Sequence, residues 1–221
     1  MKATVENIIA PAENIRVINL NCAQKLDYKA GQYLRMAVGD MDGQFYSIAS
    51  APHRNVVELH IKKGAGQSSQ YIAEQLKAGD TVTIEGVSGD MTFGSDAAKP
   101  VVMIAGGLGI APMKAMVEQI VHEKRHETDI HLYWGAAVPE ELYLRMQFEQ
   151  LSMIYRRLHV HCHAGGNIID QVLEAEHDLA ACDIYLAGRK EMLDVSISQL
   201  EKNGADPSCI FYDKAVMKRG A

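Results

Sequence analysis

Residues 101–112 read VVMIAGGLGIAP, and residues 113–120 continue as MKAMVEQI. An apolar run, a glycine cluster and a stretch of helical periodicity predict a buried strand, a tight turn and a helix. Glycines let backbone N–H groups approach a bulky ligand, and a helix start offers unpaired N–H groups to phosphate. The spacing Gly-Gly-x-Gly-x-x-Pro is not the Rossmann Gly-x-Gly-x-x-Gly. The loop alone therefore fits either a phosphate cradle or an ordinary connection.

The second half of the chain alternates apolar runs with helical periodicity from Pro100 onward. We expect strands at residues 101–105, 130–134, 158–162, 183–186 and 209–212, and helices at residues 111–123, 140–151, 168–173 and 190–202. This alternation predicts a parallel five-stranded sheet with helices on both faces. In the usual order 3-2-1-4-5, the first and fourth strands are neighbours where strand order reverses, which is where ligands bind. Residues 106–109 and Gly188 then border one crevice.

The first half of the chain has short β-rich segments separated by turn signals. Strands are expected at residues 14–20, 32–38, 45–50, 56–62 and 81–87, with one helix at residues 68–76. Short strands with such turns predict a small antiparallel Greek-key barrel. The fold class is thus a β-barrel domain over residues 1–98 followed by an α/β domain over residues 99–221.

Composition excludes several function classes. The net charge of −6 disfavours nucleic-acid binding, which needs a basic surface. No apolar run reaches the roughly 18–20 residues of a membrane span, and residues 1–7 lack the apolar core of a signal peptide. The 4 cysteines are scattered without a Cys-x-x-Cys, which disfavours metal ribbons and iron–sulfur clusters and favours reduced thiols in the cytoplasm.

Further motifs accompany the glycine loop in a consistent order. They are QFYS at residues 44–47, GAGQSS at 64–69, GVSGDM at 86–91, YWG at 133–135 and DIYLAG at 183–188. Together with residues 106–112, they make the chain resemble the ferredoxin–NADP⁺ reductase family over residues 5–213. Within that family it is most similar to the small NAD(P)H-flavin reductases, which have no iron–sulfur domain.

The resemblance implies a flavin, FAD with FMN as the alternative, held by the barrel. It assigns Tyr46 to stacking on the isoalloxazine ring and Ser47 to a hydrogen bond near flavin N5, and these two are the candidate catalytic residues. Other cofactor-binding candidates in this half are Gln44, Phe45, His60, Lys62, Gly66, Ser68 and Ser69. By their residue types alone, Tyr46 and Ser47 also fit a half-buried strand, and Ser68 and Ser69 fit an ordinary helix N-cap.

The resemblance places NADH or NADPH on the α/β half. The candidate residues for this nucleotide are Gly106, Gly107, Leu108, Gly109, Gly188 and Arg189. The glycines would let the dinucleotide lie across the sheet edge, with Gly188 giving room on the opposite wall.

The sequence departs from the family at informative positions. Gln44 replaces an arginine that pairs with flavin phosphate, so we expect weak or exchangeable flavin unless Arg35 or Arg54 compensates. Leu108 replaces a threonine beside the nicotinamide. Residues 136–138 read AAV where NADP-selective members carry basic residues, which favours NADH, with Arg189 as the remaining nearby cation.

His159, His161 and His163 alternate along one expected strand and share a face. Three histidines suit zinc or copper, but no carboxylate or cysteine is found to complete the set, and Cys162 points to the other face. An edge strand without metal is therefore the favoured interpretation.

Two functional hypotheses follow. The first is an NAD(P)H-dependent flavin oxidoreductase that passes electrons to free flavin or to an electron-acceptor protein. The alternative, motivated by Gln44 and Leu108, is a regulatory module of the same fold with weakened chemistry.

Overall fold

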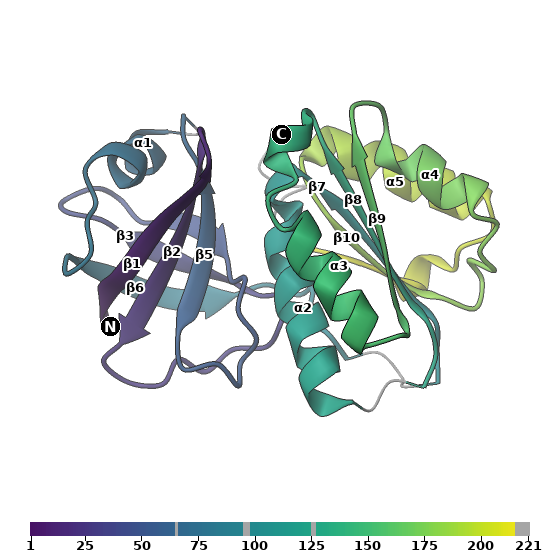
Figure 1. Cartoon of the computed structure of the whole chain (residues 1–221), viewed down its shortest axis with the longest axis horizontal. Coiled ribbons are helices and arrows are strands. Elements are labelled where there is room, and N and C mark those ends of the chain that lie inside the picture. The colour runs from purple at the N-terminus through teal and green to yellow at the C-terminus, as the bar shows by residue number, and fades with distance from the viewer. Residues whose placement is uncertain (65, 95–97, 125–126, 215–221) are drawn as a thin grey trace.

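The structure is a computed structural model that describes residues 1–64, 66–94, 98–124 and 127–214. It contains an antiparallel six-stranded sheet from the first half of the chain and a parallel five-stranded sheet from the second. Figure 1 shows the two halves side by side, with helix α2 of the second half facing the first. No helix among the described residues is long and apolar enough to cross a membrane.

The six-stranded sheet has the order β4-β3-β6-β1-β2-β5. Its strands are β1 (Lys2–Ala12), β2 (Ile15–Cys22), β3 (Tyr33–Ala37), β4 (Gln44–Ser47), β5 (Val57–Lys62) and β6 (Thr81–Ser88), with helix α1 (Gln67–Glu74) after β5. The two edges meet beyond β4, where Ile48 bridges Leu59 and the Ala49 N–H donates to the Glu58 carbonyl at 2.8 Å. This contact closes the sheet into the expected barrel.

The sequence prediction missed strand β1. Of its side chains only Ala3 and Val5 are buried, so its sequence lacks a sustained alternation. Its pairing with β2 also shifts register twice, between Val5 and Asn7 and between Ile9 and Ala12. Such bulges break the two-residue period by which a strand is recognised.

The parallel sheet has the order β11-β10-β7-β8-β9, which is the 3-2-1-4-5 order expected from the sequence. Its strands are β7 (Val101–Gly106), β8 (Ile130–Ala136), β9 (Leu158–Ala164), β10 (Asp183–Ala187) and β11 (Ile210–Tyr212). The helices between them are α2 (Ile110–Glu123), α3 (Arg145–Ile154), α4 (Ile168–Glu174) and α5 (Lys190–Lys202), with short 3₁₀ turns η1 (Gly107–Gly109), η2 (Pro139–Glu141) and η3 (Pro207–Cys209).

The expected helix at residues 140–151 is wrong at its start. Residues from Pro139 form only the 3₁₀ turn η2, and Leu142 has ψ of 44°, outside the helical range. Helix α3 begins at Arg145 and runs to Ile154. An apolar period continues through both parts, so the sequence pattern did not reveal the break.

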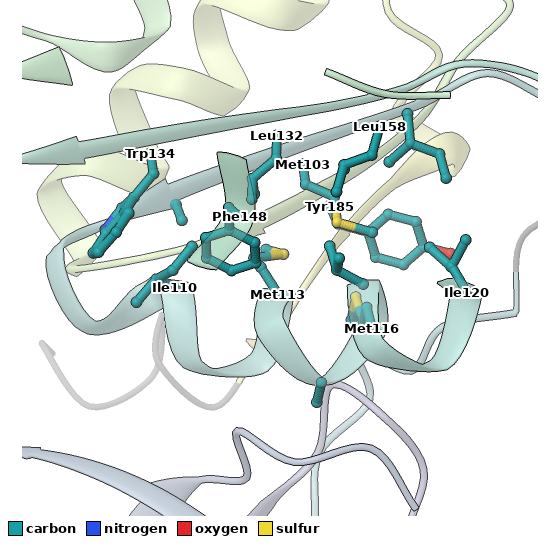
Figure 2. Close-up of a cluster of buried hydrophobic side chains, with 14 of the residues drawn as sticks. Met103, Ile110, Met113, Met116, Ile120, Leu132, Trp134, Phe148, Leu158 and Tyr185 are labelled. Atoms are coloured by element: carbon teal, nitrogen blue, oxygen red, sulfur yellow. The ribbon is translucent and has the colours of Figure 1, made fainter. Parts of the chain in front are cut away.

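Helix α2 lies between the parallel sheet and the barrel (Figure 1). Ile110 and Met113 belong to a core that also contains Trp134 of β8 and Phe148 of α3 (Figure 2). Every residue of α2 from Ile110 to Val117 is buried. A helix covered on both sides needs apolar residues all round, yet the run includes one lysine.

That lysine, Lys114, is only 3% exposed. Its Nζ lies 3.0 Å from Oε1 of Glu58 on β5 and 2.6 Å from Oε1 of Glu118, and 3.4 Å from the Ala49 carbonyl oxygen. Burial of Glu58 opposes its ionisation, but hydrogen bonds from His60 and the charge of Lys114 outweigh this and lower its pKa to about 2. The ion pair between Glu58 of β5 and Lys114 of α2 thus links the barrel to the parallel-sheet half.

A second row of contacts extends this link along β5. The Glu58 carboxylate is 2.7 Å from His60 Nε2, and His60 Nδ1 is 2.7 Å from the Tyr143 hydroxyl. Lys62 donates to Glu141 of η2, which also accepts from Asn14 at 3.0 Å. We call the set Glu58, His60, Lys62, Lys114, Glu118, Glu141 and Tyr143 the polar seam.

Lys114→Ala leaves the carboxylates of Glu58 and Glu118, whose side chains are 15% and 11% exposed, without their shared cation. We expect the free energy of unfolding to fall by about 3–5 kcal/mol, as when one partner of a buried ion pair is removed. Urea denaturation followed by circular dichroism measures it. Lys190→Ala is the matched control, because Lys190 forms an i,i+4 pair with Asp194 at 2.9 Å on a partly exposed surface. Lys190→Ala should lower the free energy of unfolding by at most about 0.5 kcal/mol. Equal losses in the two variants would contradict the role of Lys114.

Glu58→Gln should remove the part of the pH dependence of the free energy of unfolding that comes from Glu58. Because the folded pKa of Glu58, about 2, lies below its ordinary value of 4.5, its ionised form stabilises the fold above pH 4.5 and this contribution is lost as the pH falls toward 2. Between pH 5 and pH 3, the stability difference between the parent protein and the variant should shrink by about 2 kcal/mol. Urea titrations at several pH values measure the difference. A difference that stays constant over this range would show that Glu58 has an ordinary pKa.

Candidate functional site

A cavity of about 880 Å³ lies between the barrel and the carboxyl ends of the parallel strands. Strands β4 and β5 line it from the barrel side, and the turns after β7, β8, β9 and β10 line it from the other. This volume is near the upper end of ligand pockets, typically about 300–1,000 Å³. The cavity lies where the topology predicts a ligand crevice.

Most of the candidate site residues from the sequence meet in this cavity. Its lining includes Phe45, Tyr46, Ser47, His60, Lys62, Ser69, Gly106, Gly107, Leu108, Gly109, Gly188 and Arg189. Three other candidates, Gln44, Gly66 and Ser68, are not among the described lining residues.

Helix α1 begins without the serine cap considered from the sequence. Gly66 is the N-cap residue, with φ of 148° and no side-chain cap hydrogen bond. This φ favours glycine, because a Cβ would be strained there. Ser68 and Ser69 lie inside the first turn and are buried, and Ser69 Oγ donates to the Gly66 carbonyl at 2.8 Å. Within the part of the chain that the structure describes, no side-chain acceptor is found for the first N–H groups of α1. Ala65 of the same motif lies outside the described residues.

Strand β4 presents the aromatic candidates. Tyr46 pairs with Leu34 in the sheet and packs partly against the barrel core. Burial raises the pKa of Tyr46 to about 12, so its hydroxyl is neutral near pH 7. Phe45 is 43% exposed and meets Tyr33 edge to face at 5.3 Å between ring centroids.

The glycine loop is held from two sides. A Cβ at Gly109 would lie 2.1 Å from the Ala187 carbonyl oxygen, so only glycine permits this close approach to the end of β10. The Trp134 Nε1–H donates to the Gly107 carbonyl at 2.9 Å. Gly107 itself has φ of 54°, and apart from its neighbours along the chain no atom of the described residues lies within 4 Å of the position its Cβ would take. The loop thus has an anchored base and an open surface toward the cavity.

The side chain of Met192 of α5 occupies part of the space between Gly106 of the glycine loop and Gly188 on the opposite wall of the cavity. Its Sδ would be 2.3 Å from a Cβ at Gly188 and 2.7 Å from one at Gly106. The room expected beside Gly188 is therefore taken by a thioether. Met is a flexible side chain, so this filling is adjustable.

Charge in the cavity is sparse. Lys62 and Arg189 are the Lys and Arg residues among its described lining, and Asp213 is an acid. The hydrogen bond from Lys62 is the largest cause of a lowered Glu141 pKa, and Arg189 contributes more weakly. Neither arginine proposed to compensate for Gln44 lines the cavity. Arg35 pairs with Glu85 at 3.1 Å, and Arg54 lies 3.8 Å from Glu118.

Other lining residues were not among the candidate site residues from the sequence, although Met91 belongs to the motif at residues 86–91. They include Gly31, Tyr33, Met91, Gly165, Gly166, Asn167, Met192 and Asp213. Gly165 and Gly166 follow β9 directly, so their place after a parallel strand was a usable signal. Gly31, Tyr33 and Met91 come from the barrel half, outside strands β4 and β5.

The chain matches two protein families. Residues 2–93 match the oxidoreductase FAD-binding domain, and residues 103–197 match the oxidoreductase NAD-binding domain. The lining of the cavity comes from both matched regions.

Several curated proteins are similar in sequence to this chain. The NAD(P)H-flavin reductase of Aliivibrio fischeri is 30% identical over 213 residues, covering 88% of this chain and 89% of the relative. Reductase component 2 of terephthalate 1,2-dioxygenase from Comamonas sp is 33% identical over 155 residues, covering 70% of this chain and 46% of the relative. The chain thus spans less than half the length of the two terephthalate dioxygenase reductase components that it matches.

Solved structures show the same fold. The flavohem-like FAD/NAD binding domain of nitric oxide dioxygenase from Vibrio cholerae matches with a TM-score of 0.85 at 21% identity, covering 96% of this chain and 97% of that one. A ferredoxin NADP⁺ reductase from Neisseria gonorrhoeae with bound FAD and NADP matches with a TM-score of 0.79 at 20% identity, covering 92% and 91%. By its domains, its relatives and its fold, the chain belongs to the ferredoxin–NADP⁺ reductase family, with an FAD-binding and an NAD-binding domain and similarity to the NAD(P)H-flavin reductases.

Proposed function

We propose that this protein is a flavin-dependent oxidoreductase that takes hydride from NAD(P)H, with NADH favoured, onto FAD. It would pass the electrons to free flavin or to an electron-acceptor protein. The observation that carries the proposal is the single cavity lined by Tyr46 and Ser47 on one side and by the glycine loop on the other. Hydride transfer needs donor and acceptor atoms about 3–3.5 Å apart, and a shared cavity permits that approach.

The barrel side fits a flavin nucleotide. The uncapped N–H groups of α1 and the buried Ser69 beside them form a place for phosphate, since a helix N-terminus favours anions. Tyr46 offers an aromatic face, and the Ser47 hydroxyl both donates and accepts hydrogen bonds. When bound, a flavin supplies the redox chemistry, and the protein supplies binding and orientation. Gln44, Gly66 and Ser68 lie outside the described cavity lining and are kept in this proposal as cofactor-binding residues, with Gln44 beside the flavin phosphate.

The α/β side fits a nicotinamide dinucleotide. The open surface at Gly107 admits a ligand close to the backbone, and Leu108 and Gly188 border the same space. Ala136 and Ala137 line the cavity after β8, where a 2′-phosphate would call for a cation. Arg189 lies near enough to Glu141 to lower its pKa, so part of its charge is balanced there. These features favour NADH over NADPH.

The proposed domain boundaries follow from assigning the flavin to the barrel and the nicotinamide nucleotide to the α/β half. Residues 1–98 would form the flavin-binding barrel domain, and residues 99–221 the nucleotide-binding domain. We also propose a cytoplasmic location, supported by four free cysteines, Cys22, Cys162, Cys182 and Cys209.

One observation favours the alternative of a module with weakened chemistry. Gln44 replaces the family arginine, and both Arg35 and Arg54 pair with acids outside the cavity. Leu108 adds apolar bulk within the glycine loop. A module of this kind would bind nucleotide but turn it over poorly.

Purified full-length chain should oxidise NADH when FAD or FMN is added, with a lower kcat/KM for NADPH. Spectrophotometric assays with both nucleotides and both flavins measure this. No flavin binding and no NADH oxidation would leave only the module. A much higher kcat/KM for NADPH would contradict the proposed nucleotide preference.

Gln44→Arg should tighten FAD binding. A charge-assisted hydrogen bond to phosphate contributes roughly 1.5–3 kcal/mol, which corresponds to about a 10–100-fold lower Kd. Fluorescence titration with FAD measures the change. Gln150→Arg, an equal charge change at an exposed position of α3, is the control and should leave the Kd unchanged. Equal FAD affinity in the Gln44 variant and the parent protein would refute the phosphate assignment.

A further inference from the structure

A cluster of histidines lies at the amino ends of β8 and β9, the opposite end of the sheet from the cavity. His131 and His159 face each other in register, with ring centroids 4.7 Å apart and ring planes inclined by 20°. Asp129 directly precedes β8, and its Oδ1 is 3.3 Å from His159 Nε2. The sequence grouped His159 with His161 and His163, whereas the structure groups it with a histidine and an acid from the neighbouring segment.

These three side chains have the spacing of metal ligands. One ligand atom from each lies within 4.8 Å of the other two. A tetrahedral zinc ion bonds nitrogen or oxygen at about 2.0–2.2 Å, which places neighbouring ligand atoms roughly 3.3–3.6 Å apart. The pair Asp129–His159 already has this separation. A side-chain movement of about 1 Å would bring the His131 ligand atom to the same separation from the other two, and a small rotation about its side-chain bonds is enough for this.

We propose that Asp129, His131 and His159 form a binding site for a divalent transition-metal ion of the zinc type. Two imidazoles and one carboxylate suit zinc, whereas magnesium and calcium prefer all-oxygen sites. Water would complete the coordination. The side chains of Asp129 and His159 are 58% and 41% exposed, so the ion has an open path to the site and exchanges with solvent.

A neighbouring histidine supports the arrangement. His131 Nδ1 lies 3.4 Å from His161 Nε2, and the two rings are stacked at 5.7 Å. Ligating histidines commonly use their second nitrogen for such an orienting contact. An ion here would tie the segment before β8 to the edge strand β9, away from the redox cavity, so its role would be to stabilise the sheet edge.

Titration of the full chain, free of any histidine tag, with zinc chloride in a calorimeter tests the proposal. We expect saturable binding of one ion at this site and no binding of magnesium. Asp129→Asn, His131→Ala and His159→Ala should each weaken the Kd for zinc by at least about tenfold. His163→Ala, on the same strand but outside the cluster, is the control and should bind as the parent protein does.

Thermal unfolding gives a second readout, which does not depend on whether a variant retains oxidoreductase activity. Zinc in large excess over its Kd should raise the Tm of the parent protein and of His163→Ala by several degrees, because it binds the folded chain preferentially. The Tm of the His131 and His159 variants should rise clearly less at the same zinc concentration, because their weaker binding contributes less stabilisation. Zinc affinities and Tm shifts that are the same in all four variants would overturn the site and leave the Asp129–His159 contact as an ordinary surface ion pair.

Discussion

A buried ammonium group must be paired, and in this protein that requirement joins two halves of the chain. Lys114 sits in the middle of a helix that is covered on both sides, and its nearest acids are Glu118 on the same helix and Glu58 on the barrel. An unpaired charge in such a place costs several kcal/mol. The barrel and the parallel sheet therefore favour the one arrangement in which β5 brings Glu58 to α2.

Strand geometry extends this constraint to the cavity. Along β5, Val57, Leu59 and Ile61 point into the barrel core, and the alternate residues form the polar seam. His60 and Lys62 contact Tyr143 and Glu141, and both also line the cavity. The same strand face thus docks the halves and forms part of the site between them. Trp134 connects the polar seam to the glycine loop. Its ring meets that of Tyr143 edge to face at 5.5 Å between centroids, and its Nε1–H donates to the Gly107 carbonyl.

Parts of this architecture were readable from the sequence for physical reasons. The glycine loop, the alternation of strands and helices and the strand order follow from local patterns and from topology, and the structure confirms them. Strand β1 was missed because its bulges break the two-residue period. The helix start was placed too early, near residue 140, because the backbone of Leu142 leaves the helical range while the apolar pattern continues through it. Lys114 was an overlooked signal, since a single lysine in an apolar helical run predicts a buried partner. That partner, 56 residues earlier in the chain, has no local signature.

In the proposed function, flavin and nicotinamide meet in one cavity, with one face of the nicotinamide turned to the flavin. Anaerobic stopped-flow reduction of the FAD-saturated protein by NADH tests this most directly, using NADH deuterated at one or the other of the two C4 positions. Flavin bleaching should slow with deuterium at one C4 position and not at the other. Equal rates for the two labelled forms, or no bleaching in a single turnover, would contradict this arrangement.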